Sequence, residues 1–313
     1  MSDQSKSIRP ILSVTIGPLL DSYAESFRQA LAELAQCDPT LQVTALDGNR
    51  VLVGGTSEMQ LMSLCIELGD TRRIPLATGD WTVILQEKLR RVAEGEGKYI
   101  RQTGGSGNYG HVKLRLEPKG EGEGFEFSNE VPQALLPSEY AAAAEAGVRK
   151  AALSGVFFGH EVTDVKATLF DASYHEADSN SGAFFIAGMA AFKMAAKKSN
   201  PWLLEPVMAV ETEIPEAHAG NFIEDLNARR GRIEAVERGS GSVAFKALVP
   251  LRETLRSSAR GRLEHPMQFA RYEPVLNPHD EIGGDPLGVG VRNRRLPNLN
   301  SGRAEAELYF ELE

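Results

Sequence analysis

Three glycines near residue 107 are spaced as in loops that bind nucleotides. Gly105, Gly107 and Gly110 fit the pattern G-x-G-x-x-G, which places a pyrophosphate at the start of a helix. Residues 111–116 alternate between apolar and polar as a strand does, so the helix N-terminus that this chemistry needs is not expected. A kinase glycine-rich loop has the same spacing, but the sequence contains no H-R-D or D-F-G motif. We therefore expect a contact hairpin here, with no cofactor.

Neither a phosphate-binding loop nor a catalytic cluster is indicated by the remaining motifs. No G-x-x-x-x-G-K-[ST] phosphate loop occurs in the 313 residues, so we expect neither GTP nor ATP hydrolysis and no enzyme activity. His175, Glu176 and Asp178 are close in sequence and could be imagined as a metal or acid–base cluster. Neighbours on one loop point in different directions, so we favour a solvated loop with no metal and no catalytic residue.

Two polar loops, residues 104–110 and 173–179, each follow a strand-like run. The first contains four glycines among seven residues, which permits a close approach to another surface, and Asn108 and Tyr109 supply polar and aromatic contact groups. We therefore predict an exposed tip that enters a partner, with contact groups free of the core.

Two local sets of basic residues are further candidates for contact with RNA. They are Lys193, Lys197 and Lys198, and Arg229, Arg230 and Arg232. An ordinary solvated face explains such sets about as well as RNA contact does, so both interpretations stay open.

The composition indicates an acidic, folded protein of two or three domains. The length of 313 residues exceeds one ordinary core, and the formal net charge of −9 argues against binding nucleic acid through overall charge. Cys37 and Cys65 form no C-x-x-C pair, which favours a reducing cytoplasm. Residues 1–10 are a polar tail without a signal segment, and we expect neither export nor a membrane span.

Hydrophobic periodicity predicts an α+β fold with the order βαββαβ at both ends. Within residues 11–90, strands are expected at 11–16, 41–46, 50–53 and 81–85, with helices near 23–34 and 57–68. Within residues 204–274, strands are expected at 207–214, 232–236, 243–249 and 267–272, with helices at 216–228 and 251–260. This order lets two helices cover one face of an antiparallel sheet, so we predict two ferredoxin-like domains.

Residues 91–203 form a different central domain in this interpretation. Strands are predicted at 98–103, 111–116, 124–129 and 162–170, with helices at 138–152 and 183–198. Ser179, Asn180 and Ser181 are candidate caps for the second helix. Residues 202–206 are predicted to be a junction, and residues 275–313 an extension whose last strand-like segment, 304–312, suits docking on a sheet edge.

The chain resembles elongation factor G, the ribosomal translocase, over the last three domains of that family. The landmarks occur in the family's order, at residues 104–112, 173–175, 178–179, 195–198, 204–206 and 229–232. Asp38-Pro39-Thr40 is similar to a segment of the third domain, so the resemblance covers residues 11–274 as domains three, four and five, without the GTPase domain. It implies a ribosomal-protein-S5-like fold for the central domain.

The resemblance also implies contact residues. In that family two tip loops enter the decoding region of the small subunit beside messenger and transfer RNA. Carried over by position, the contacts are Ser106, Gly107, Asn108 and Tyr109 in one loop, and His175, Glu176, Ala177 and Asp178 in the other. Family members usually have a basic residue at Ser106, Gln at Asn108 and a larger apolar residue at Ala177, so this tip has lost a positive charge. The last helix is also abbreviated near residues 256–261.

We therefore expect a non-catalytic protein of the cytoplasm that binds the ribosome or a translation factor through its tip. A GTPase partner acting in trans stays an open alternative, and no membrane partner is expected. A second hypothesis is a truncated paralogue that acts as a protein-interaction module away from the ribosome, which the net acidity and the lost tip charge favour. The third and least favoured is a nucleotide-dependent enzyme that uses the glycine-rich loop.

Overall fold

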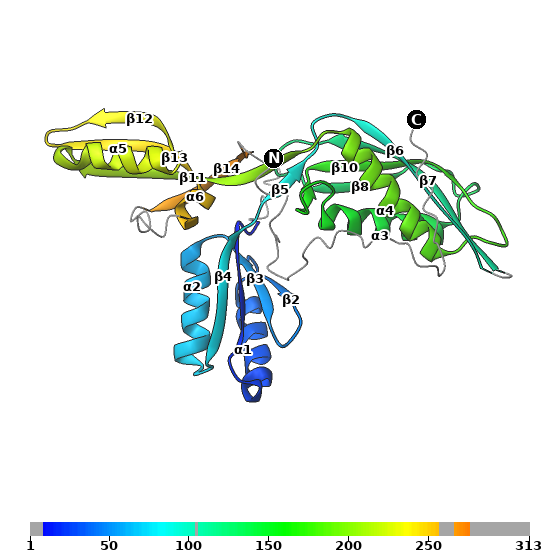
Figure 1. Ribbon diagram of the computed structural model, residues 1–313, viewed down its shortest axis with the longest axis horizontal. Helices are drawn as coiled ribbons and strands as arrows, with labels where there is room; N and C mark the ends of the chain where they lie inside the picture. Colours follow the sequence, from blue (N-terminus) through cyan, green and yellow to red (C-terminus); the bar gives the residue numbers. More distant parts are fainter. Residues whose placement is uncertain (1–8, 104–105, 257–265, 276–313) are drawn as a thin grey trace, which may run out of the picture. The chain divides into compact units, whose positions relative to one another are not determined.

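The computed structural model describes residues 9–103, 106–256 and 266–275 (Figure 1). Contacts divide the chain into two compact units. The first unit holds the described residues of Met1–Leu85 and Glu205–Pro274, and the second holds those of Gln86–Leu204 and Val275–Glu313. Helices and several sheets alternate along the chain, which confirms the predicted α+β class. The division into three domains, with the bounds expected from the sequence, stays a prediction.

The N-terminal part of the first unit follows the order β-α-β-β-α-β. Its elements are β1 (Leu12–Pro18), α1 (Ala24–Cys37), β2 (Gln42–Ala45), β3 (Val51–Gly55), α2 (Glu58–Ile66) and β4 (Leu76–Val83). The antiparallel sheet has the strand order β2-β3-β1-β4. Gly48 and Asn49 lie in the three-residue loop 47–49 of the β2–β3 hairpin with φ angles of 71° and 60°, left-handed values that glycine and asparagine accept. Apolar residues of β1 and the helices, such as Ile16, Phe27 and Leu61, fill the core.

The C-terminal part of the first unit repeats this order. Its elements are β11 (Trp202–Pro215), which belongs to this unit from Glu205 on, α5 (Ala219–Ala228), β12 (Arg232–Arg238), β13 (Ser242–Pro250), α6 (Leu251–Arg256) and β14 (Met267–Pro274). β13 lies between β12 and β11, and β14 also pairs with β11. The core contains Val210, Phe222, Leu226 and Phe245. The predicted end of the last helix, including the predicted shortening of that helix, falls on residues 257–265, which lie outside the described residues. Residues 276–313 also lie outside them.

β11 begins earlier than the sequence indicates. Residues 202–206 are predicted to be a junction, but Trp202, Leu203 and Leu204 pair with the short strand β5 (Gln86–Lys88). β5 also pairs in parallel with β9 (Val162–Thr163). Strands of two or three residues are too short to produce a recognisable periodicity, so the sequence did not reveal them.

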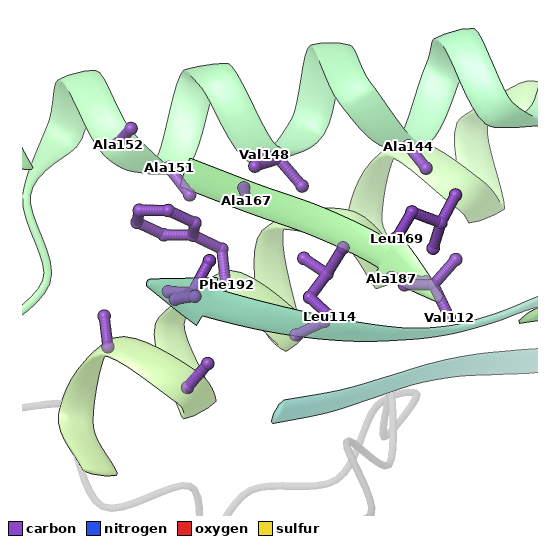
Figure 2. Close-up of a cluster of buried hydrophobic side chains, with 14 of the residues drawn as sticks. Val112, Leu114, Ala144, Val148, Ala151, Ala152, Ala167, Leu169, Ala187 and Phe192 are labelled. Atoms are coloured by element: carbon purple, nitrogen blue, oxygen red, sulfur yellow. The ribbon is translucent and has the colours of Figure 1, made fainter. Parts of the chain in front are cut away.

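The second unit is built on a sheet with the strand order β6-β7-β10-β8. The strands are β6 (Ala93–Thr103), β7 (Ser106–Pro118), β8 (Phe125–Asn129) and β10 (Val165–Ser173). The helices α3 (Ser138–Ser154) and α4 (Ser181–Lys198) share one hydrophobic core with the sheet. Figure 2 shows Val148 of α3, Leu114 of β7 and Leu169 of β10 among the side chains that gather there. Among the described residues no helix is long and apolar enough to span a membrane.

Glycines allow α4 to lie very close to β6. A Cβ atom on Gly97 would overlap the carbonyl oxygen of Ala187, and one on Gly95 would overlap that of Ala191. Ala187, Ala191 and Ala195 of α4 are fully buried, so no larger side chain separates the helix from the strand. This close packing fixes the start of α4 relative to β6 and β7, and the candidate site lies at that end.

Candidate nucleic-acid interface

Residues 106–110 belong to a strand. The sequence predicts a loop over residues 104–110, but β7 begins at Ser106, and its first residue pairs with Thr103 of β6. Gly104 and Gly105 lie outside the described residues. Glycine accepts extended backbone as readily as turns, and residues 106–110 pair in continuous register with residues 99–103 of β6. Asn108 and Tyr109 are therefore held by a sheet.

The second polar segment, between β10 and α4, is closed by its own hydrogen bonds. The backbone N–H of His175 donates to Ser179 Oγ over 2.9 Å, and the N–H of Ser179 donates to the His175 carbonyl over 3.0 Å. Asn180 is the N-cap of α4, because its Oδ1 accepts from the N–H of Ala183 over 2.9 Å. Of the three predicted cap candidates, Asn180 fills this position.

Hydrogen bonds join these two segments directly. Asp178 Oδ1 accepts from the N–H of Gly107 over 3.1 Å, and the Asp178 carbonyl accepts from the N–H of Tyr109 over 2.7 Å. Asn180 Nδ2 donates to Asn108 Oδ1 over 2.5 Å. Gly107, Asn108, Tyr109, His175 and Asp178 thus form one cluster, which we call the tip cluster. Asp178 links the two segments within it.

A chain of polar contacts supports Tyr109 from the sheet. Its Oη lies 2.8 Å from Ser173 Oγ, and the same Oγ lies 2.9 Å from His111 Nδ1. His111 Nε2 lies 2.6 Å from Glu96 Oε1. The Tyr109 ring packs edge-on against the His175 ring, with centroids 4.2 Å apart. Sequence reasoning missed the contribution of Glu96 and His111, although alternation along the two strands places them on the same face.

Exposure divides the predicted contact residues into two groups. His175, Glu176 and Ala177 are exposed, whereas Gly107, Asn108, Tyr109 and Asp178 are half-buried. The prediction that these groups would be exposed is wrong for Asn108 and Tyr109, which are half-buried and held by hydrogen bonds between the segments, although neither belongs to the hydrophobic core. The structure does bring Asn108, Tyr109 and His175 together. The side chain of Ser106 lies outside the described residues.

The arginines 229, 230 and 232 do not form a free basic surface. The Arg229 side chain is 2% exposed and its Nε lies 2.9 Å from Asp225 Oδ2, so this residue is not a surface contact. Arg230 pairs with Glu253 over 2.8 Å and Arg232 pairs with Glu273 over 2.9 Å. A buried guanidinium requires a compensating carboxylate, and Asp225 supplies it from one helical turn away. We leave these arginines out of the interface.

Arg230 also lies against a second carboxylate, that of Glu205. Its Nη2 is 3.3 Å from Glu205 Oε1, and the Glu205 side chain is almost fully buried. Burial raises the pKa of the Glu205 carboxyl, although the positive charge of Arg230 opposes this shift. The family landmark at residues 204–206 therefore meets the one at residues 229–232 inside the fold.

Comparison with known proteins gives matches in the same regions. Residues 82–200 match the family described as elongation factor G, domain IV, and residues 202–281 match the elongation factor G C-terminus. The crystal structure of a protein from Thermus thermophilus is similar to this chain, with a TM-score of 0.61 and 33% sequence identity. The similarity covers 88% of this chain and 42% of that one, so the chain spans less than half the length of this relative.

Proposed function

This chain belongs to the elongation factor G family, and we propose that it binds the ribosome through the tip of its domain IV, without catalysis of its own. The proposal places the tip beside messenger and transfer RNA on the small subunit, as the family resemblance implies. The lack of a phosphate-loop sequence in these 313 residues supports a role in contact only.

The observation that carries this proposal is the direct joining of the two tip segments. Three hydrogen bonds connect residues 107–109 with residues 178–180, which are about seventy positions apart in the chain. His175, Glu176 and Ala177, which precede Asp178 in the sequence, are exposed. A binding surface that is ordered before it meets its partner loses little conformational entropy on binding, which favours affinity.

The chemistry of the tip suits RNA bases better than phosphates. Its exposed residues contribute an imidazole and a carboxylate, and the position that is usually basic in the family is Ser106. Proteins recognise unstacked RNA bases by aromatic stacking and by hydrogen bonds to base edges. The His175 ring, supported by Tyr109, and the amide of Asn108 can supply these two kinds of contact.

The combined change Asn108→Ala with His175→Ala, the tip variant, should weaken ribosome binding at least about tenfold, because central contact residues often contribute about 2 kcal/mol each. Co-sedimentation with purified ribosomes at several protein concentrations measures this effect. The free energy of unfolding, measured in urea, should fall by only about 1 kcal/mol. The Asn108 side chain makes one hydrogen bond, to another side chain, and His175 is exposed.

The matched control is His218→Ala with Asn227→Ala, which removes the same two residue types from exposed positions of the first unit. This control should co-sediment like the parent protein. If the tip variant stays folded and binds ribosomes as the parent does, the tip makes no useful contact and the proposal is wrong. That result would favour the alternative of a protein-interaction module away from the ribosome.

A further inference from the structure

We infer that the second unit carries another RNA-binding surface, which recognises the phosphodiester backbone of single-stranded RNA. The surface comprises Arg90, Arg91, Lys197, Lys198 and Trp202, and we call it the α4-end patch. None of these residues belongs to the tip cluster. The inference concerns RNA itself, so it is tested without the ribosome and stands apart from the proposed function of the tip.

Specific contacts bring the residues of the α4-end patch together. Arg91 Nε donates to the carbonyl oxygen of Lys198 over 2.9 Å and so attaches the segment after β5 to the last turn of α4. The guanidinium carbon of Arg90 lies 4.6 Å from the centroid of the Trp202 ring. Trp202 is itself held in register by its pairing with Lys88 of β5. Residues 90–91 and 197–202, two segments that are distant in the sequence, thus meet here, with Arg90 over the indole and Arg91 at the end of α4.

The cations of this patch are available to a ligand. All four are exposed, and within the described residues none of them forms an ion pair with a carboxylate. Elsewhere in the same unit, Lys113, Arg115 and Lys119 pair with Asp171, Glu94 and Glu126. Lys98, Arg101, Lys150 and Lys193 are also exposed without an ion pair among the described residues, so what distinguishes the patch is the indole beside its cations. Such a surface attracts phosphates even when the whole protein is acidic.

An ordinary explanation accounts for only part of the patch. Lys197 and Lys198 lie in the last turn of α4, where positive charge interacts favourably with the helix dipole, and Arg91 satisfies a terminal carbonyl. Neither effect requires Arg90 or an indole that remains 45% exposed. A cation–π contact orders Arg90 while its charge stays in solvent, and the exposed indole offers a stacking surface. Phosphate contacts combined with base stacking are typical of single-stranded RNA binding.

The test uses the full chain and a fluorescent single-stranded RNA of about 20 nucleotides, enough to span one ordinary binding site. The patch variant combines Arg90→Gln, Lys197→Gln and Lys198→Gln, and Arg91 is kept because it caps α4. Fluorescence anisotropy should show at least about tenfold weaker binding at ~0.1 M salt. The slope of log K against log salt concentration should become smaller by about 2, or about 0.7 for each phosphate that the variant no longer neutralises.

A control variant with the same net charge separates a local site from a general charge effect. Arg28→Gln, Arg72→Gln and Lys246→Gln also remove three cations, but each of these is paired with a carboxylate. This control should bind RNA like the parent. The inference is overturned if the control loses as much affinity as the patch variant, or if the patch variant binds RNA as the parent does.

The stacking contribution is tested separately. Trp202→Phe should bind RNA nearly as the parent does, whereas Trp202→Thr should bind about tenfold more weakly with an unchanged salt slope, because stacking releases no counterions. Threonine suits a strand, and a melting curve confirms that the variant is folded. Equal binding by both variants would remove the indole from the site.

Two further measurements identify the ligand class and separate this inference from the tip. The parent is also mixed with vesicles that contain anionic lipids. If the parent binds these vesicles but not RNA, and the patch variant binds neither, the surface belongs to membranes and the inference is overturned. The tip variant should keep the salt slope of the parent, because the contacts proposed for the tip are to bases and release no counterions. A loss of RNA binding in the tip variant equal to that in the patch variant would place the RNA at the tip and likewise overturn the inference.

Discussion

Replacing Glu87 by alanine should destabilise the second unit by about 3–5 kcal/mol, because a buried charged group with many partners is being removed. Glu87 is 0% exposed. Its carboxylate accepts hydrogen bonds from the backbone N–H groups of five consecutive residues, 156–160, at 2.8–3.3 Å. Without the carboxylate, these donors lose their partner, and the loop after α3 keeps only its backbone pairing with β5. Hydrogen bonds to a charged acceptor are also stronger than neutral ones.

Urea unfolding monitored together with amide hydrogen exchange will measure this effect. The amides of residues 156–160 should exchange much faster in the alanine variant. Glu87→Gln retains one acceptor oxygen, so its loss of stability should be intermediate. Glu121→Ala, an exposed glutamate of the same unit, serves as the control and should change stability by less than about 0.5 kcal/mol. A Glu87→Ala protein as stable as this control would contradict the prediction.

The change Gly97→Ala should reduce the stability of the second unit by about 3 kcal/mol, at the upper end of the range for overpacked cores. The new methyl group would overlap the carbonyl oxygen of Ala187, which belongs to the backbone of α4 and cannot rotate away. The helix must therefore shift from β6. Because the start of α4 also carries the Asn180 cap and the tip junction, ribosome binding should fall together with stability.

Gly220→Ala is the matched control for this substitution. Gly220 lies in α5, and an added Cβ atom there meets nothing within 4 Å. Alanine is the better helix former, so this change should raise stability by up to about 1 kcal/mol. Chemical denaturation of both variants gives the comparison. Equal stability of the two variants would show that α4 does not lie against β6 as closely as described.

Local patterns account for the parts of the fold that the sequence predicted well. The element order of residues 12–83 follows from alternating and helical spacings, and the β2–β3 turn follows from Gly48 and Asn49, which accept left-handed backbone. The Asn180 cap belongs to the same class, because a cap depends on residues three positions apart. The short strands β5 and β9 have no such local signal.

The amino-acid sequence by itself determined the α+β class, the order of the main elements and the family landmarks, since each depends on residues that are near one another in the chain. Only the tertiary structure decided which charges are free. In the folded chain Arg229 is buried against Asp225, and backbone N–H groups surround the Glu87 carboxylate. Arg90 is exposed and lies over the Trp202 ring. The tertiary structure also made residues 106–110 a strand and joined them to Asp178. Composition and periodicity do not record which distant segments meet, and the pairing of those segments sets burial and charge.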